Sequence, residues 1–421
     1  MRDLIIFGVI FGILPFALYR PVIGVFLFTW VSLMNPHRLT YGSAYDFPFA
    51  AVIVVITILG LIISRQPKQF PTTPLTVVLI LFMVWMTLTS FFALEPGLVW
   101  IEWNRVIKTL FMVLITIYAI NTEKDIKLFA WVIVLSLAFY GFKGGIFTIV
   151  SGGKSLVMGP PDSYIGENNG LALALITVLP IIWYLKLQSS NKWLTMALTG
   201  LAVLTLVAAA GTYSRGAMLA GSGMLFFLWL KGQHKFRVGL ALILVIPLIY
   251  TVMPDKWFER METIDNYQTD DSALGRINAW GFATNVATSN LLGGGYSVFT
   301  PKMFHYYAPV PQDYHAAHSI YFQVLGEHGF VGLALFLLLM LLTWRTGSRI
   351  IKNCRDKVEL KWAADLAAMS QVSIIGYAIA GAFLSLAYYD LYYNIMILLV
   401  LLEKIVLNKT TDINIRKLPA Q

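Results

Sequence analysis

PDKWFERMETIDNYQTDDSALGRINAW, residues 254–280, begins the polar stretch around which the rest of this chain is organised. The stretch runs to Ser319 and carries seven acidic and four basic residues between two long apolar runs. It also holds three of the six histidines of the chain: His305, His315 and His318. Charged side chains are costly in the core of a bilayer. We therefore expect this stretch to lie in water, where chemistry on a polar substrate can take place.

The composition of the whole chain predicts a membrane protein. Of the 421 residues, 58% are hydrophobic and 13% are charged, and the mean hydropathy is +0.71. Soluble domains carry about 25% charged residues. The apolar runs are close to the length of about 20 residues that a membrane-spanning helix needs, and alternating strand patterns are not sustained anywhere. We predict an all-α polytopic membrane protein.

The net charge of +9 and the single cysteine exclude several classes of protein. The basic residues lie in short loops, as is typical of polytopic membrane proteins, and form no basic face interleaved with aromatic residues. We therefore expect no nucleic-acid partner. Cys354 alone can form neither an intrachain disulfide nor a multi-cysteine metal site. No small-residue cleavage site follows the first apolar run, so we expect no cleaved signal peptide.

Basic residues in short loops also give the orientation, because cytoplasmic loops collect Lys and Arg. We expect the following segments in the cytoplasm: 65–68, 124–127, 186–192, 231–237, 345–361 and the tail after 404. The segments between them fall on the opposite side: 35–49, 95–103, 151–169, 212–216, 254–319 and 388–393. This alternation gives eleven spans after residue 48. A cytoplasmic N-terminus then requires one net crossing in residues 1–35, which makes about twelve spans in all.

The chain divides into four parts on this interpretation. Residues 1–253 form a transmembrane bundle, 254–318 an outer loop, 319–407 the C-terminal transmembrane helices and 408–421 a cytoplasmic tail. Apolar and aromatic positions predict amphipathic helices over 256–263 and 272–289, lying along the membrane surface. The three glycines at 293–295 end the second of these helices.

Arg215 lies in AGTYSRGAM, residues 210–218, a short turn between two apolar runs on the outer side. The positive-inside rule disfavours an arginine there. One interpretation is a side chain that reaches toward lipid headgroups. The other is an anion clamp, because a guanidinium binds phosphate oxygens in a bidentate manner. Arg276, at the start of the second predicted loop helix, is either an ordinary solvated residue or the second cation that a diphosphate requires.

His318 lies where the loop meets the next apolar run. A histidine that is neutral near pH 7 can act as a general base, although a histidine in a loop is more often structural. His315 competes for the same role. Glu167, Asn168 and Asn169 end the 151–169 loop and either cap the following helix or contact a sugar or headgroup. Downstream, Gly326, Gly329 and Gly332 predict a close helix-packing face.

Missing motifs exclude further classes. The chain has no Asp-x-Asp pair for a nucleotide sugar, no phosphate loop and no His-Glu-x-x-His zinc site. Acidic residues are nearly absent from the predicted spans, which leaves a proton- or sodium-coupled transporter few groups to use.

Four stretches of the chain, in this order and spacing, resemble the bacterial O-antigen ligase and polymerase superfamily of multi-spanning inner-membrane glycosyltransferases. They are SRGA at 214–217, GR at 275–276 followed by Trp280, LGGG at 292–295 with Phe299, and HS at 318–319 followed by LGEHGFVG at 325–332. The resemblance covers residues 166–342. In addition, the pair RP at residues 20–21 and the stretch MNPHR at residues 34–38 resemble a branch of probable O-glycosylation ligases linked to protein sorting. The family often has Asn after the histidine where this chain has Ser319.

The resemblance implies a long helical periplasmic loop and a site facing the periplasm. It implies that Arg215 and Arg276 bind the diphosphate of an undecaprenyl-diphosphate-linked glycan and that His318 is the catalytic base. His315, Glu167 and Asn168 are accessory candidates from the residues themselves. The acceptor would be lipid A–core, a second lipid-linked glycan or a protein hydroxyl. No cofactor is implied, and two arginines can replace a divalent ion, so we expect no metal. A lipid-linked glycan transporter without chemistry is the alternative from another class.

Overall fold

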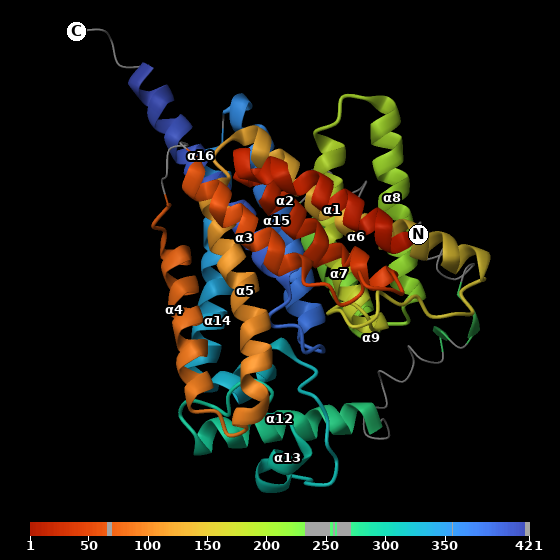
Figure 1. Cartoon of the computed structure of the whole chain (residues 1–421). Coiled ribbons are helices and arrows are strands. Elements are labelled where there is room, and N and C mark those ends of the chain that lie inside the picture. Colours follow the sequence, from red (N-terminus) through yellow and green to blue (C-terminus); the bar gives the residue numbers. More distant parts are fainter. Residues whose placement is uncertain (65–69, 232–252, 256, 259–270, 356, 417–421) are drawn as a thin grey trace.

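The computed structural model describes residues 1–64, 70–231, 253–255, 257–258, 271–355 and 357–416 (Figure 1). Throughout these residues the regular elements are helical, which confirms the all-α prediction. The helices are α1 (Arg2–Tyr19), α2 (Pro21–Met34), η1 (Pro36–Leu39), α3 (Phe49–Ile63), α4 (Pro74–Phe91), α5 (Pro96–Ala119), α6 (Glu123–Val150), α7 (Asn168–Leu187), α8 (Lys192–Gly211), α9 (Arg215–Lys231), α12 (Asp271–Ser289), α13 (Pro301–Tyr307), α14 (Ile320–Asn353), η3 (Val358–Leu360), α15 (Lys361–Gly381) and α16 (Asp390–Arg416).

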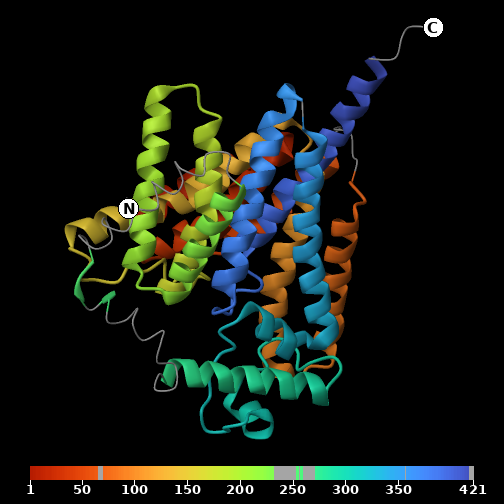
Figure 2. The same cartoon turned by 180° about the vertical axis from the view of Figure 1, so that it is seen from behind.

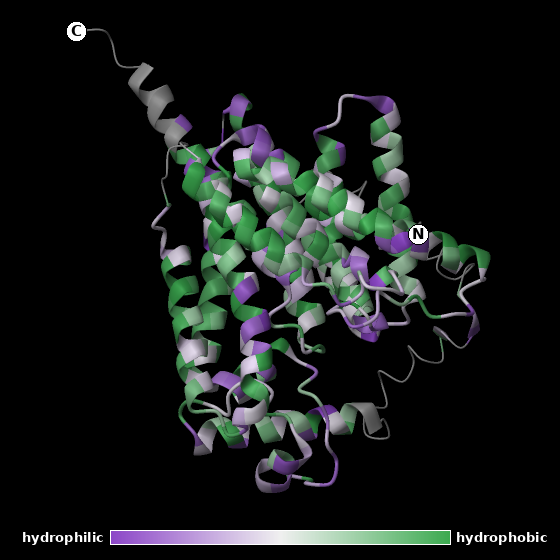
Figure 3. Ribbon diagram, viewed as in Figure 1, coloured by the Kyte–Doolittle hydropathy of each residue, from purple (hydrophilic) through white to green (hydrophobic). Residues whose placement is uncertain are grey.

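Seven helical segments among the described residues are long and apolar enough to cross a membrane: α1, α4, α6, α7, α8, α14 and η3 with α15. The helices α2 and α3 are apolar but shorter. Figure 3 shows apolar residues over most of the bundle, with hydrophilic residues at its ends and around α13. The chain is therefore a polytopic membrane protein. The eleven spans expected after residue 48 stay a prediction, because the span expected after segment 231–237 lies outside the described residues, as does segment 65–68.

The first 35 residues differ from the expectation of one net crossing. They form α1 and α2, and the chain reverses at Arg20 between them. At the start of α1, the Asp3 carboxylate accepts a hydrogen bond from the backbone N–H of Ala44 (3.1 Å), in the loop that follows α2. At the other end, Arg20 pairs with Asp125 at the start of α6 (3.0 Å). The expectation is therefore wrong, because α1 begins at the same end of the molecule as the loop after α2.

Helices α12 and α13 form a layer across one end of the bundle, which we call the outer layer together with the loops up to Ser319. In Figure 1 and, from behind, in Figure 2, α12 runs across the ends of α4 and α14 and α13 lies beyond it. The helix predicted over 272–289 is confirmed as α12, which ends before the glycines at 293–295. The helix predicted over 256–263 lies almost wholly outside the described residues.

The outer layer is held to the bundle where α14 is interrupted. Gly329 has a φ of 67°, so the helix breaks there, and the carbonyls of Gly326 and Glu327 accept hydrogen bonds from the backbone N–H groups of Gly294 and Gly295 (both 2.8 Å). A left-handed backbone of this kind favours glycine. The predicted glycine face is thus only partly a contact between spanning helices, since its first two members pack on the outer layer and Gly332 packs on Trp85 of α4.

The side chain of Glu327 adds two hydrogen bonds at the same place. Its carboxylate accepts hydrogen bonds from the backbone N–H of Ser297 (3.2 Å) and the hydroxyl of Tyr388 (2.6 Å). The residue is 5% exposed, and a buried carboxylate is tolerated only where hydrogen bonds satisfy it. The outer layer, α14 and the turn before α16 are therefore joined at one point.

Candidate active site

One cavity lies where the outer layer meets the bundle. It has a volume of about 160 Å³ and draws its lining from α7, the α8–α9 turn, α12, the segment before α14 and the turn after α15. The lining residues are Asn169, Tyr213, Ser214, Arg215, Gly216, Arg276, His318, Phe383 and Leu384. The structure therefore brings together the two arginines and the histidine that the sequence separates by up to about a hundred positions.

Arg215 is the first residue of α9 and follows a three-residue turn. Tyr213 takes a left-handed backbone (φ 57°) in that turn, and its hydroxyl donates to the carbonyl of Gly153 (2.6 Å). The Ser214 hydroxyl accepts from the N–H of Ala217 (3.3 Å), so it caps the helix. The N-terminus of α9 thus faces the cavity, and the helix dipole there favours an anion.

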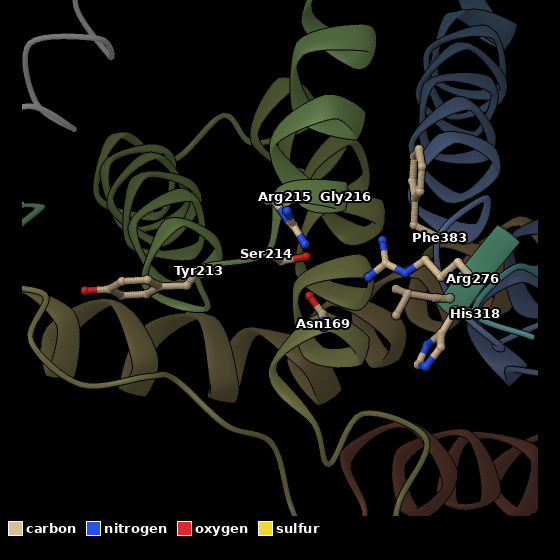
Figure 4. A pocket seen from close by; sticks show the side chains of 9 residues that line it. Asn169, Tyr213, Ser214, Arg215, Gly216, Arg276, His318 and Phe383 are labelled. Carbon is tan, nitrogen blue, oxygen red and sulfur yellow. The ribbon is translucent and has the colours of Figure 1, made fainter. Parts of the chain in front are cut away.

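Arg276 enters the cavity from the opposite wall, in the second turn of α12. Figure 4 shows the guanidinium groups of Arg215 and Arg276 pointing toward one another, with Ser214 and Asn169 beside them. Guanidinium groups bind phosphate oxygens in a bidentate manner. Two of them that face one cavity can therefore bind a ligand with two negative charges.

His318 lies beside Arg276 at the edge of the cavity (Figure 4). Burial of the ring lowers its pKa below the ordinary value of 6.5, and the neighbouring positive charge of Arg276 lowers the pKa further; Glu167 acts in the opposite direction. The imidazole is therefore neutral at pH 7. A neutral histidine can accept a proton, which is the protonation state a general base needs.

His315 is placed differently from His318, although only two residues separate them. Its Nε2 lies 2.7 Å from a carboxylate oxygen of Asp313, and its ring packs on Gly275, where an added Cβ would overlap with it. The residues that line the cavity do not include His315. Of the two candidates for the base, the structure brings His318 to the arginines and places His315 beneath the start of α12.

The other two accessory candidates flank the cavity. Glu167 occupies the N-cap position of α7, but its side chain caps none of the described N–H groups of that helix. Asn168 donates through its amide to the carbonyl of Thr212 (2.8 Å), so it holds the α8–α9 turn in place. The next residue, Asn169, is the one that lines the cavity. The expectation that this segment caps α7 through a side chain is therefore wrong for Glu167.

Sequence reasoning singled out Asn169 but not Tyr213, Ser214, Phe383 or Leu384 as lining residues. Ser214 is adjacent to Arg215, so its polar side chain in the same turn was the available signal. Phe383 and Leu384 belong to the turn between α15 and α16, and their apolar character had marked them as part of a span. Tyr213 faces away from the arginines in Figure 4.

Two family models match the chain. Residues 200–337 match a family described as O-Antigen ligase, and residues 1–190 match a family of unknown function (DUF5935). No curated protein matches the chain. The first match contains Arg215, Arg276 and His318, whereas Asn169 comes from the second, and Phe383 and Leu384 lie beyond both.

Proposed function

We propose that this protein, a member of the O-antigen ligase superfamily, is an O-antigen ligase of the inner membrane. It transfers a glycan from undecaprenyl diphosphate to lipid A–core on the periplasmic side. The observation that carries the proposal is the convergence of Arg215, Arg276 and His318 on one cavity at the outer-layer end of the bundle. Members of this superfamily are glycosyltransferase-like enzymes that work at a membrane, and the helical bundle fits that setting.

The size of the cavity favours the diphosphate as its occupant. A cavity of about 150 Å³ holds one benzene molecule, so a cavity of about 160 Å³ matches a diphosphate group in size better than an oligosaccharide. On this proposal the two guanidinium groups and the N-terminus of α9 bind the diphosphate. The sugar that it carries then lies at the edge of the cavity, where His318 is found.

The reaction proceeds by direct displacement. Neutral His318 accepts the proton of the acceptor hydroxyl while that oxygen forms a bond to the anomeric carbon, and the bond from the anomeric carbon to the diphosphate oxygen breaks. The polyprenyl diphosphate leaves with the bonding electron pair, and Arg215 and Arg276 stabilise its charge, as preorganised cations do in a site that excludes water. Attack from the side opposite the leaving group inverts the anomeric configuration.

The acceptor distinguishes this proposal from its two relatives in the superfamily. An O-antigen polymerase uses a second lipid-linked glycan, and a protein O-oligosaccharyltransferase uses a Ser or Thr hydroxyl. The experiment offers the purified protein a lipid-linked glycan with lipid A–core, with a second lipid-linked glycan, or with an acceptor protein, in the presence and absence of EDTA. We expect the product on lipid A–core, at a rate that EDTA leaves unchanged. A product on the second lipid-linked glycan would show a polymerase activity in place of the ligase activity, and a product on the acceptor protein would show a protein glycosyltransferase activity.

Two histidine variants test the chemistry in the same assay. His318→Ala removes the base and should lower kcat by about 10²–10⁴-fold while the donor still binds, because general-base catalysis contributes that much. His305→Ala removes an exposed histidine on α13, away from the cavity, and serves as the matched control. If His318→Ala transfers glycan as fast as the unchanged protein, His318 is not the base and the proposed chemistry is wrong. If the unchanged protein itself transfers no glycan, a transporter becomes the better interpretation.

A further inference from the structure

The backbone of His318 is held in an unfavourable conformation. Its φ is 43°, in the left-handed region, which side chains other than glycine rarely adopt without support from their surroundings. This conformation turns the chain just before α14, whose N-cap is Ser319. The direction of the imidazole therefore depends on whatever contacts keep this backbone in place.

Two hydrogen bonds bracket the residue. The backbone N–H of His318 donates to the hydroxyl of Ser385 (2.8 Å), and the indole N–H of Trp280 donates to the carbonyl of Ala317 (3.0 Å). That carbonyl and that N–H belong to the same peptide group. The peptide before His318 is thus held on both sides, by α12 through Trp280 and by the turn after α15 through Ser385.

Trp280 lies one helical turn after Arg276, so the two side chains project from the same face of α12. Its ring also stacks on Phe322 of α14, with 4.9 Å between the ring centroids and 7° between the planes. Ser385 directly follows Phe383 and Leu384, which line the cavity. Each residue that holds the peptide therefore belongs to an element that also supplies a wall of the site.

We propose that Trp280 and Ser385 are positioning residues, which orient the proton-accepting imidazole by holding the peptide between Ala317 and His318. The proposal rests on the proposed function, since it assumes that His318 takes the proton of the acceptor. It adds that α12 has two tasks: it carries Arg276 to the leaving group and, one turn later, fixes the base. Displacement of α12 would disturb both together.

Trp280→Phe tests the first of these residues, because phenylalanine keeps an aromatic ring that can stack on Phe322 but has no N–H to donate. The matched control is Trp85→Phe, which removes an indole N–H bond of similar length to a backbone carbonyl of α14, that of His328 (2.9 Å). Loss of one hydrogen bond that orients a reacting group should lower kcat by about tenfold. We expect this from Trp280→Phe with an unchanged KM for the lipid-linked donor, and no such loss from the control.

Variants of Ser385 and a double variant distinguish a positioning role from a purely structural role. Ser385→Ala should lower kcat, and Ser385→Thr, which retains a hydroxyl, should restore it. In a protein that already carries His318→Ala, Trp280→Phe should cost nothing more, because both changes act through one side chain. A residue with only a structural role would reduce the residual rate in both backgrounds.

The outcomes keep the two proposals apart. If His318→Ala abolishes transfer but Trp280→Phe and Ser385→Ala match the unchanged protein, the positioning proposal is overturned and the proposed function stands. Equal loss in Trp280→Phe and Trp85→Phe, or full additivity with His318→Ala, also overturns positioning. If His318→Ala transfers normally, or the unchanged protein transfers to none of the acceptors, both proposals fail.

Discussion

The two walls of the cavity are built differently. The wall that carries Arg215 belongs to the helix bundle: its turn joins two apolar helices and is tied by side chains to α7 and to Gly153. The wall that carries Arg276 and His318 belongs to the outer layer, whose own core is a small apolar cluster between α12, α13 and their loop: Ala279, Phe282, Val286, Val298, Met303 and Phe304. The bundle wall is fixed by packing along whole helices, whereas the outer wall rests on this small cluster and on hydrogen bonds to the bundle, such as those from Gly294 and Gly295 to α14. The reacting groups meet at the boundary between the two.

The largest expected effect comes from removing the cation of either wall. Arg215→Ala and Arg276→Ala should each lower kcat by about 10²–10³-fold, the loss seen when one stabilising donor is removed from a charged transition state. The measurement is transfer from the lipid-linked donor under saturating conditions. If one variant keeps full activity, only the arginine of the other wall binds the diphosphate. The proposal that both walls contribute a cation would then be wrong.

A change that loosens only the outer wall should come next. Asn278 is 5% exposed, and its amide bonds with the backbone of Val310 (2.8 and 2.9 Å) and of Asp313 (2.7 Å). Asn278→Ala leaves those groups without partners, at a cost of about 1–3 kcal/mol. We expect faster hydrogen exchange in 301–317 and reduced transfer, with unchanged exchange in α8.

The control for that experiment is Asn285→Ala on the same helix. Its amide donates to the carbonyl of Tyr307 (2.8 Å), but the bond is exposed to solvent, so its loss should change exchange far less. Equal hydrogen exchange of residues 301–317 in the two variants would contradict the role given to the buried amide of Asn278.

The pH dependence should distinguish the two arginines. His318 has a lowered pKa and acts in its neutral form, so kcat/KM should be constant near pH 7 and fall as the pH drops through a value below 6.5. Arg276 is one cause of that lowering. In Arg276→Gln the acid limb of the residual activity should therefore move to higher pH. Arg215→Gln should leave the limb in place, and a limb that moves equally in both variants would contradict the assignment.

The smallest effect is expected from His315→Ala. Its ring packs on Gly275 and pairs with Asp313 at a side chain that is 37% exposed, so its loss should lower kcat by no more than about fivefold. Transfer rates for this variant and for His318→Ala, measured together, compare the two candidates for the base directly. A loss as large as that of His318→Ala would make His315 part of the chemistry.

Physical reasoning from the sequence identified Arg215 in the bundle wall, whereas the family resemblance identified Arg276 and His318 in the outer wall. Arg215 stood out because a basic residue in a short outer turn contradicts the usual charge distribution. Arg276 had no such signal, since an arginine in a polar loop is ordinary. His318 and His315 could not be separated, because no residue type in the sequence indicates the left-handed backbone at His318 or shows that His318 lines the cavity while His315 packs on Gly275.

Two parts of the fold escaped sequence reasoning for a common reason. The turn at Phe383–Ser385 is apolar enough to pass for the end of a span, and the reversal at Arg20 lies between two apolar runs that could equally form one broken helix. Hydropathy shows that a segment prefers lipid but not where it bends. In both places the bend depends on partners distant in the sequence, Asp125 for Arg20 and His318 for Ser385.

The small volume of the cavity has a consequence for the range of donors. If the site binds the diphosphate and leaves the saccharide outside, it recognises the diphosphate that every such lipid carries and not the sugars attached to it. Glycans of different lengths and sugar orders would then be transferred at similar rates, and a cell could alter its surface polysaccharide without changing this enzyme.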